Sequence, residues 1–393
     1  MSDDPGALNS AGLKALGAGD AATAVALLRR AVAADAASPL LWYNLSTALN
    51  VAGDAAAESK ALDEALDREP YLTHALLAKG RLHERQGETA KALEFYQRLV
   101  AAVDPAAQYG PGFTAGLAHA RAALARAGEE LAAALDSAVA PLLAESDADA
   151  GGRFRHFVDT ALGRRRIFVH QPLVLHYPYL PAEQYFSRRH FPWLAQLEAA
   201  TPVIREELKG LLATGGEGFA PYVAYPPGTP VNQWAELNHN DAWAAQFLIK
   251  HGANQDAVRE RCPQTAAVLD SLPLLDLPGR GPVAFFSLLK PATHIPPHTG
   301  ATNIRTIIHL PLIVPPGCTF RVGNETRPWV EGEAFAFDDT IEHEAINPSD
   351  ELRAVLIIDT WNPHLSADER ALLRQYVAAL DTTQGGKGTF EAG

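Results

Sequence analysis

The chain has 393 residues, of which 47% are hydrophobic and 20% are charged, so disorder over most of its length is excluded. At roughly 150 residues per domain, two or three domains are expected. The 33 basic and 46 acidic residues give a net charge of −13, which argues against general binding to nucleic-acid phosphates. Only two cysteines are present, Cys262 and Cys318, and these cannot form a disulfide framework.

The first residues, MSDDPGALNS, are acidic and lack the basic start and apolar stretch of a secretory signal. No run approaches the roughly 18 apolar residues of a membrane helix. We therefore expect a cytoplasmic protein that binds neither a membrane nor nucleic acid.

A 34-residue period runs through the alanine-rich N-terminal part. It is marked by the pairs Gly19-Asp20, Gly53-Asp54 and Gly87-Glu88. Small residues precede each pair by seven positions, and large ones follow its glycine by nine; they are Gly12, Ser46 and Gly80, then Leu28, Leu62 and Tyr96. This period is typical of tetratricopeptide repeats, in which small residues lie where two helices cross. A plain alanine-rich helical bundle is the alternative.

The repeat prediction extends over residues 1–145 as an α-helical solenoid. Such solenoids present a concave surface that binds peptide segments, although a structural or dimerising role is an alternative. Residues 146–175 are predicted to be a connecting linker, which begins within the acidic and small stretch ESDADAGG (Glu145–Gly152).

Residues 176–381 are predicted to form a β-domain with flanking helices, followed by a flexible tail over 382–393. Short β-type runs are separated by Pro, Gly, Asn and Asp, which favours a sandwich or barrel. The runs are Val283–Leu289, Arg305–Val314, Thr319–Val322, Ala334–Phe337, His343–Asn347 and Ala354–Asp359, before a helix at Ser366–Leu380. The predicted fold class is multidomain α+β.

The spacing of two histidines and an arginine in the β-region indicates a particular kind of site. His298 precedes a strand, His343 lies at a turn 45 residues later, and Arg353 opens the next strand. This spacing is expected of a non-haem Fe(II) site in a double-stranded β-helix, where an arginine pairs with a dicarboxylate cosubstrate. The alternative is that the histidines are ordinary turn residues.

The usual facial triad also has a carboxylate two residues after the first histidine. That position is Gly300. A third ligand could come from one of four acidic residues, Asp338, Asp339, Glu342 or Glu344, although the last two flank His343 and would point away from it in a strand. The alternative is a metal with only two protein ligands, completed by water and cosubstrate.

The stretch from His294 to Arg370 resembles the aspartyl/asparaginyl β-hydroxylase family of 2-oxoglutarate- and Fe(II)-dependent oxygenases. The matching text is HIPPHTGATNIRTIIHLPL, then CTFRVGNETRPWVEGEAFAFDDTIEHEAIN, then RAVLIIDTWNPHLSADER. The resemblance covers roughly residues 176–378, and the glycine at the triad position is a family feature. The domain order, with tetratricopeptide repeats before such a domain, is similar to that of the animal enzymes of this family.

The resemblance implies a role for each site residue. His298 and His343 would bind Fe(II), Arg353 and Ser287 the distal carboxylate of 2-oxoglutarate, and His309 would lie near its iron-chelating carboxylate. Arg305 would contact an acidic or amide group of the substrate. Where the family often has a second basic residue, this chain has Ile307. Arg305 and Arg353 are expected to make the pocket locally positive.

The function predicted from these residues is that of a dioxygenase using Fe(II), 2-oxoglutarate and O2. It would β-hydroxylate an Asp- or Asn-type side chain of a peptide, protein or small molecule, and a polypeptide substrate could contact the repeats. A halogenase-like outcome is a minor variant. The alternative function is an inactive repeat-containing scaffold whose β-domain is a binding module.

Overall fold

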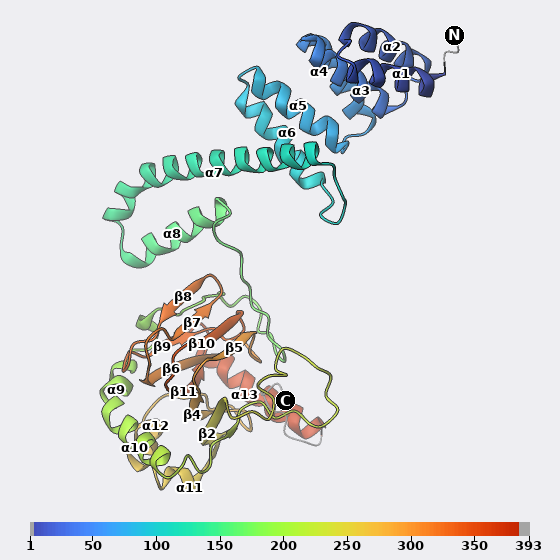
Figure 1. The fold of residues 1–393 in the computed structure, drawn as a ribbon. Helices are drawn as coiled ribbons and strands as arrows, with labels where there is room; N and C mark the ends of the chain where they lie inside the picture. Colours follow the sequence, from blue (N-terminus) through green and yellow to red (C-terminus); the bar gives the residue numbers. More distant parts are fainter. Residues whose placement is uncertain (1–3, 385–393) are drawn as a thin grey trace. The chain divides into compact units, whose positions relative to one another are not determined.

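A computed structural model describes residues 4–384. The chain divides into two compact units, Met1–Val158 and Asp159–Gly393, whose elements are labelled in Figure 1. Each unit has hydrophobic clusters of its own. The predicted α+β class, with helical repeats before an antiparallel β-domain, is confirmed.

Six helices of similar length make three consecutive hairpins in the first unit. They are α1 (Pro5–Gly17), α2 (Ala21–Ala34), α3 (Pro39–Ala52), α4 (Ala55–Arg68), α5 (Thr73–Arg85) and α6 (Thr89–Ala102). The first residues of the odd helices lie 34 positions apart, and so do those of the even helices. The structure therefore confirms the repeat period.

The glycine–acid pairs make the turn inside each hairpin. Gly53 has φ +77°, a left-handed conformation that glycine adopts without steric cost, and it ends α3. Asp54 then caps α4 by accepting a hydrogen bond from the backbone N–H of Ala57, 3.0 Å away. This dipeptide thus ends one helix and starts the next, and Asp20 caps α2 in the same way by accepting from the N–H of Thr23 at 3.0 Å.

The small residues lie where the helices of a hairpin cross, as the sequence predicts. An added Cβ at Gly12 would meet the side chain of Leu28 at 2.7 Å, and one at Gly80 would collide with the ring of Tyr96. Leu28 and Tyr96 are both buried. The backbone of one helix therefore contacts a large side chain of the other directly.

Two further helices follow the hairpins, α7 (Pro111–Glu145) and α8 (Ala148–Ala161). The predicted linker 146–175 thus includes a helix, and its last residues belong to the second unit and hydrogen-bond within it. Leu173 N–H donates to the carbonyl of Gly300 (3.0 Å), and Val174 N–H to that of Ala301 (2.9 Å). Within residues 4–384, no helix combines the length and apolar character needed to cross a membrane.

The second unit contains two antiparallel sheets. The larger has the order β1-β2-β4-β11-β6-β9, with β3 paired to β2, and the smaller has the order β5-β10-β7-β8. The larger sheet comprises β1 (Ala220–Pro221), β2 (Trp243–Lys250), β3 (Ala253–Asn254), β4 (Ala284–Leu289), β6 (Arg305–Ile313), β9 (Phe335–Phe337) and β11 (Arg353–Trp361). The smaller comprises β5 (Thr293–His298), β7 (Thr319–Val322), β8 (Glu325–Pro328) and β10 (His343–Asn347).

Helices cover the outer face of the larger sheet (Figure 1). They are α9 (Leu194–Ala199), α10 (Thr201–Ala213), α11 (Asp256–Arg259) and α12 (Pro263–Asp270), preceded by the short 3-10 helix η1 (Arg188–His190). One cluster joins helix residues such as Leu208 to sheet residues such as Phe286. A second cluster joins the two sheets, for example Val355 of the larger with Phe320 of the smaller.

The chain ends in α13 (Ala367–Gln384), where the sequence predicts a helix from Ser366. Ser366 and Glu369 form a reciprocal capping box, with N···O distances of 2.7 and 3.3 Å. The predicted tail 382–393 overlaps this helix, and its residues 385–393 lie outside the described part of the chain.

Gly80→Ala should destabilise the first unit because the new methyl group would be forced against the buried ring of Tyr96. We expect a loss of about 1–3 kcal/mol in the free energy of unfolding. Gly128→Ala is the matched control, since its Cβ would meet nothing within 4 Å in α7, and it should be neutral or slightly stabilising. Denaturant unfolding followed by far-ultraviolet circular dichroism measures both; equal effects would contradict the packing argument.

Candidate functional site

A cavity of about 620 Å³ is lined by residues of both sheets. All six residues that the sequence singles out line it, namely Ser287, His298, Arg305, His309, His343 and Arg353. The fold thus brings together side chains from five different strands.

The two histidines are cross-strand neighbours. His298 ends β5, His343 begins β10, and the strand register pairs them directly, with ring centroids 4.0 Å apart. In each ring Nδ1 lies beside a backbone carbonyl two residues earlier, that of Pro296 at 2.8 Å and that of Ile341 at 2.9 Å. Because a carbonyl only accepts, Nδ1 carries the proton, and Nε2 keeps the lone pair that can bind a metal.

Burial keeps both rings neutral. It lowers the pKa of His298 to about 4. The pKa of His343 lies well below its ordinary value because of burial and the adjacent His298. Metal binding needs neutral imidazole, so at neutral pH neither ring has to lose a proton first.

Arg353 is a buried cation whose charge is not neutralised locally. It opens β11, its exposed fraction is 2%, and its guanidinium carbon lies 5.0 Å from the ring centre of Trp329. Burial lowers its pKa to about 10. Among residues 4–384 no carboxylate lies within ion-pair distance of this guanidinium. A charged group placed this way favours binding of an anion.

Ser287 and His309 flank this cation on neighbouring strands. Ser287 lies on β4, and its hydroxyl oxygen accepts the indole N–H of Trp243 at 3.2 Å, which leaves its proton for another acceptor. His309 lies on β6 and stacks on Trp329 with ring centroids 5.4 Å apart. Burial and the charge of Arg353 hold the pKa of His309 well below its ordinary value. The pocket thus offers a neutral ring and a hydroxyl beside the guanidinium.

Arg305 differs from the expectation of a free positive charge. Its guanidinium lies 2.8 Å from a carboxylate oxygen of Asp339 and 3.8 Å from one of Asp359. Burial raises the pKa of Asp339 above its ordinary value and that of Asp359 to about 7. Ile307, which lines the same cavity, is buried and apolar, so the second basic residue that the resemblance implies is absent at this position. The charge of Arg305 is therefore balanced inside the pocket, as is that of Arg280 by Asp381, and among the described lining residues Arg353 is the guanidinium without a carboxylate partner.

The four candidates for a third metal ligand differ in their partners and in their position relative to Gly300. Glu342 and Glu344 both pair with Arg321, and Asp338 lies 2.9 Å from the ring of His170. Asp339 alone faces Gly300, where an added Cβ would collide with its carboxylate. A carboxylate from another loop thus occupies the space that a side chain at position 300 would need.

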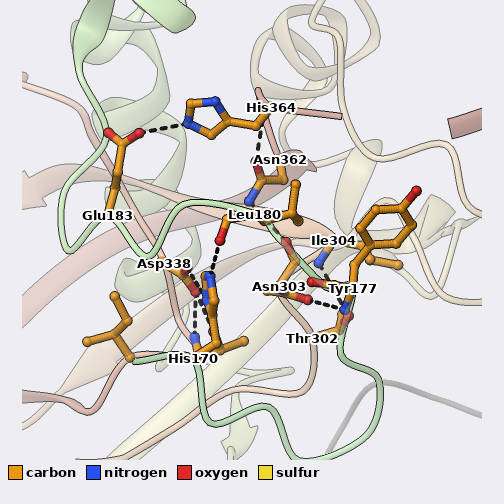
Figure 2. Close-up of polar contacts among 12 residues, drawn as sticks. His170, Tyr177, Leu180, Glu183, Thr302, Asn303, Ile304, Asp338, Asn362 and His364 are labelled. Atoms are coloured by element: carbon orange, nitrogen blue, oxygen red, sulfur yellow. Dashed lines mark hydrogen bonds and ion pairs between the residues drawn. The ribbon is translucent and has the colours of Figure 1, made fainter. Parts of the chain in front are cut away.

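A segment before the sheets, residues 170–190, braces the loop that carries Asp339; we call it the leading segment. His170 lies within 3.0 Å of Asp338 and Thr340 through Nδ1, and within 3.1 Å of the carbonyl of Leu180 through Nε2 (Figure 2). Burial opposes protonation of this ring, but the hydrogen bond and charge of Asp338 raise its pKa overall. Both ring nitrogens face acceptors, as a charged imidazolium requires.

Two kinds of pocket residue were missed by the sequence reasoning. One is the aromatic wall, in which Trp234 packs edge-on against His298 with ring centroids 4.9 Å apart. The other is Asp359, which lies on β11 six residues after Arg353 and lines the same cavity. Residues an even number of positions apart in a strand lie on the same face of the sheet. The spacing of six between Arg353 and Asp359 therefore indicates that both side chains face the cavity.

The site lies in an antiparallel β-domain and combines two histidines, a serine hydroxyl and a buried arginine. Residues 198–363 match the family model described as aspartyl/asparaginyl beta-hydroxylase. Over these residues the second unit is similar to this family.

Two curated relatives illustrate the range of the family. The chain is 35% identical over 138 residues to the human aspartyl/asparaginyl beta-hydroxylase. This match covers 35% of this chain and 18% of that protein. It is 32% identical over 197 residues to the ornithine lipid ester-linked acyl 2-hydroxylase of Rhizobium tropici, 49% of this chain and 66% of that protein. The chain therefore spans less than two thirds of either relative.

Among solved structures, the chain is similar to the TPR domain of Sgt2 from Aspergillus fumigatus. The TM-score is 0.28 and the identity 18%, over 32% of this chain and 82% of that domain.

The contact between His170 and Asp338 should stabilise the second unit more in mild acid than in base. The pKa of His170 is raised in the folded state, so the contribution is complete below the unfolded pKa of about 6.5 and is lost as pH rises through the folded value. His170→Ala should therefore cost about 2 kcal/mol near pH 6 and less near pH 9. Tryptophan fluorescence follows this unit, which holds five of the six tryptophans. A cost that does not vary with pH would refute the charged pair.

Proposed function

We propose that the second unit is a 2-oxoglutarate- and Fe(II)-dependent dioxygenase. The observation on which this rests is Arg353, a buried guanidinium without a local counter-charge. A dicarboxylate supplies the missing charge, and a guanidinium binds a carboxylate through two parallel hydrogen bonds. The hydroxyl of Ser287 adds a third donor to the same carboxylate.

His298 and His343 are the proposed iron ligands, through the Nε2 atoms that their carbonyl contacts leave available. His309 is proposed to contact the carboxylate of 2-oxoglutarate that chelates the metal. When bound, iron and 2-oxoglutarate activate O2 and supply the oxidant, with succinate and CO2 as the cosubstrate products. The chain's own residues hold and orient both groups, and Trp234 and Trp243 shield His298 from bulk water.

The strand order supports the finer fold assignment, a double-stranded β-helix. From β4 to β11 the chain passes repeatedly between the sheets. The strands β4, β6, β9 and β11 lie in the larger sheet, and β5, β7, β8 and β10 lie in the smaller. The proposed ligands occupy adjacent strands of the smaller sheet and Arg353 a strand of the larger, which suits a site at the mouth of such a domain.

The environment of Gly300 supports a metal held by two protein ligands. No side chain projects from this position, and the carboxylate of Asp339 fills the adjacent space. A halide would need that space, so the arrangement favours hydroxylation over halogenation. Asp339 remains hydrogen-bonded to Arg305 at 2.8 Å.

The proposed substrate class is based on the reactions for which the two relatives are named. Aspartyl/asparaginyl β-hydroxylation and ester-linked acyl 2-hydroxylation both place a hydroxyl on a CH2 group next to a carbonyl carbon. We propose the same reaction here, on an Asp- or Asn-type side chain. Because Arg305 is paired with Asp339, a neutral amide fits the pocket better than a carboxylate.

The repeats are proposed to contact a polypeptide that carries the target residue. Stacked helical hairpins form the extended surface that such repeats use for binding. The alternative, an inactive scaffold, leaves unexplained why two neutral histidines, a hydroxyl and an unpaired buried arginine line one cavity. An acyl substrate, as named for the bacterial relative, is the competing substrate class.

Substitution of the proposed ligands should abolish turnover. His298→Ala and His343→Ala should each reduce Fe(II)-dependent conversion of 2-oxoglutarate to succinate by at least about 100-fold. His294→Ala is the matched control, because His294 lies on the same strand but is exposed and paired with Glu344. Succinate formation by the purified chain, with and without asparaginyl peptides, measures the effect. Full activity of either ligand variant would disprove the assignment.

Arg353→Ala should mainly weaken cosubstrate binding. We expect the KM for 2-oxoglutarate to rise by about 10- to 100-fold, the loss of a charge-assisted pair. Arg327→Ala serves as control, since Arg327 is an exposed residue of β8. An unchanged KM in the Arg353 variant would show that the distal carboxylate binds elsewhere.

A further inference from the structure

A second group of metal-binding side chains lies outside the main cavity. It consists of Glu183, His190 and His364, and one ligand atom from each lies within 4.8 Å of the other two. Glu183 belongs to the leading segment, His190 ends η1, and His364 follows β11. None of the three lines the cavity that holds His298 and His343. We call this group the outer cluster.

The backbone around His364 is fixed by buried contacts. Asn362 is fully buried, and its side chain donates to the carbonyl of Asn303 (3.0 Å) while accepting the backbone N–H of His364 (3.0 Å). The ring of His364 then points to Glu183, with Nε2 2.7 Å from the carboxylate (Figure 2). The backbone that carries this ring is therefore held by buried contacts, in addition to the contact of the ring with Glu183.

His190 is the third member of the group. Its ring centroid lies 5.2 Å from that of His364, at an interplanar angle of 62°. Phe186 and Phe191 pack near the two rings and give the group an apolar side. The side chains of Glu183 and His364 are 33% and 25% exposed, so a cation can reach them from solvent.

We propose that the outer cluster binds a divalent transition-metal cation, with Zn²⁺ as the best match. Two imidazoles and a carboxylate suit zinc, whose bonds to such ligands are about 2.0–2.2 Å and whose fourth position can hold water. The cation replaces the direct contact between His364 and Glu183, because both would bind it. Only modest closure of the ligand atoms is needed, which side-chain rotation and the loop that carries Glu183 can supply.

A cation here ties the leading segment to the end of β11. The same strand begins at Arg353, and the leading segment braces the loop of Asp339 through His170. Binding therefore stabilises the second unit without entering the main cavity. The simpler possibility is a plain hydrogen bond between His364 and Glu183, and the experiment below separates the two.

The test counts bound metal in the full-length chain. Zn²⁺ is measured by equilibrium dialysis and elemental analysis in wild type, in His298→Ala/His343→Ala, and in that double variant with His190→Gln and His364→Gln added. We expect two, one and no equivalents. Glutamine keeps a hydrogen-bond donor for Glu183, and circular dichroism checks that each variant is folded.

A matched control uses the other exposed histidine–glutamate pair of this unit, His294 and Glu344, whose atoms lie 2.7 Å apart. His294→Gln should leave the stoichiometry of the double variant at one. Loss of all zinc in the double variant, or retention of one equivalent after substitution of His190 and His364, overturns the proposal. One equivalent in both wild type and the double variant supports the outer cluster while counting against the metal site of the proposed function.

Discussion

The pairing of β5 with β10 is the constraint on which the site depends. It sets His343 directly opposite His298 and turns both rings to the cavity side. Side chains alternate along a strand, so a slip of β5 by one residue against β10 would send the ring of His298 to the opposite face, away from His343. The carbonyls of Pro296 and Ile341 then fix which nitrogen is protonated. Register and tautomer are thus set by backbone geometry before any ligand arrives.

The pocket also concentrates buried charge, and the rest of the unit must compensate for it. Arg305, Asp339, Asp359 and Arg353 are all largely removed from water, which costs several kcal/mol per unpaired ion. The charges of Arg305, Asp339 and Asp359 offset one another, whereas the charge of Arg353 has no local partner. Two hydrophobic clusters, one between the sheets and one beneath the helices, provide the opposing free energy. Affinity for an anion is therefore built into the folded state.

The sequence predicted most elements whose signals are local. The hairpin period was readable because Gly–Asp turns and small crossing residues recur at fixed spacing, and the predicted runs at β7 and β10 match the strands. Strand β5 was missed because Pro296 and Pro297 lack ladder donors, which an edge strand tolerates. The pocket histidines and Arg353 were found from their spacing and family resemblance. The pairing of Arg305 with Asp339 and the outer cluster depend on distant segments meeting in the fold, which periodicity does not encode.

The contact between Gly300 and Asp339 limits how this pocket can change over time. A chain that gained a carboxylate at position 300 would first have to move Asp339, and with it the partner of Arg305. The intermediate with both acids would crowd two negative groups into one small volume, while the variant lacking Asp339 would leave Arg305 with the more distant Asp359. Either single step is unfavourable, so placing a carboxylate at position 300 would require at least two coupled substitutions. The two-histidine arrangement is thus kept by the packing around it.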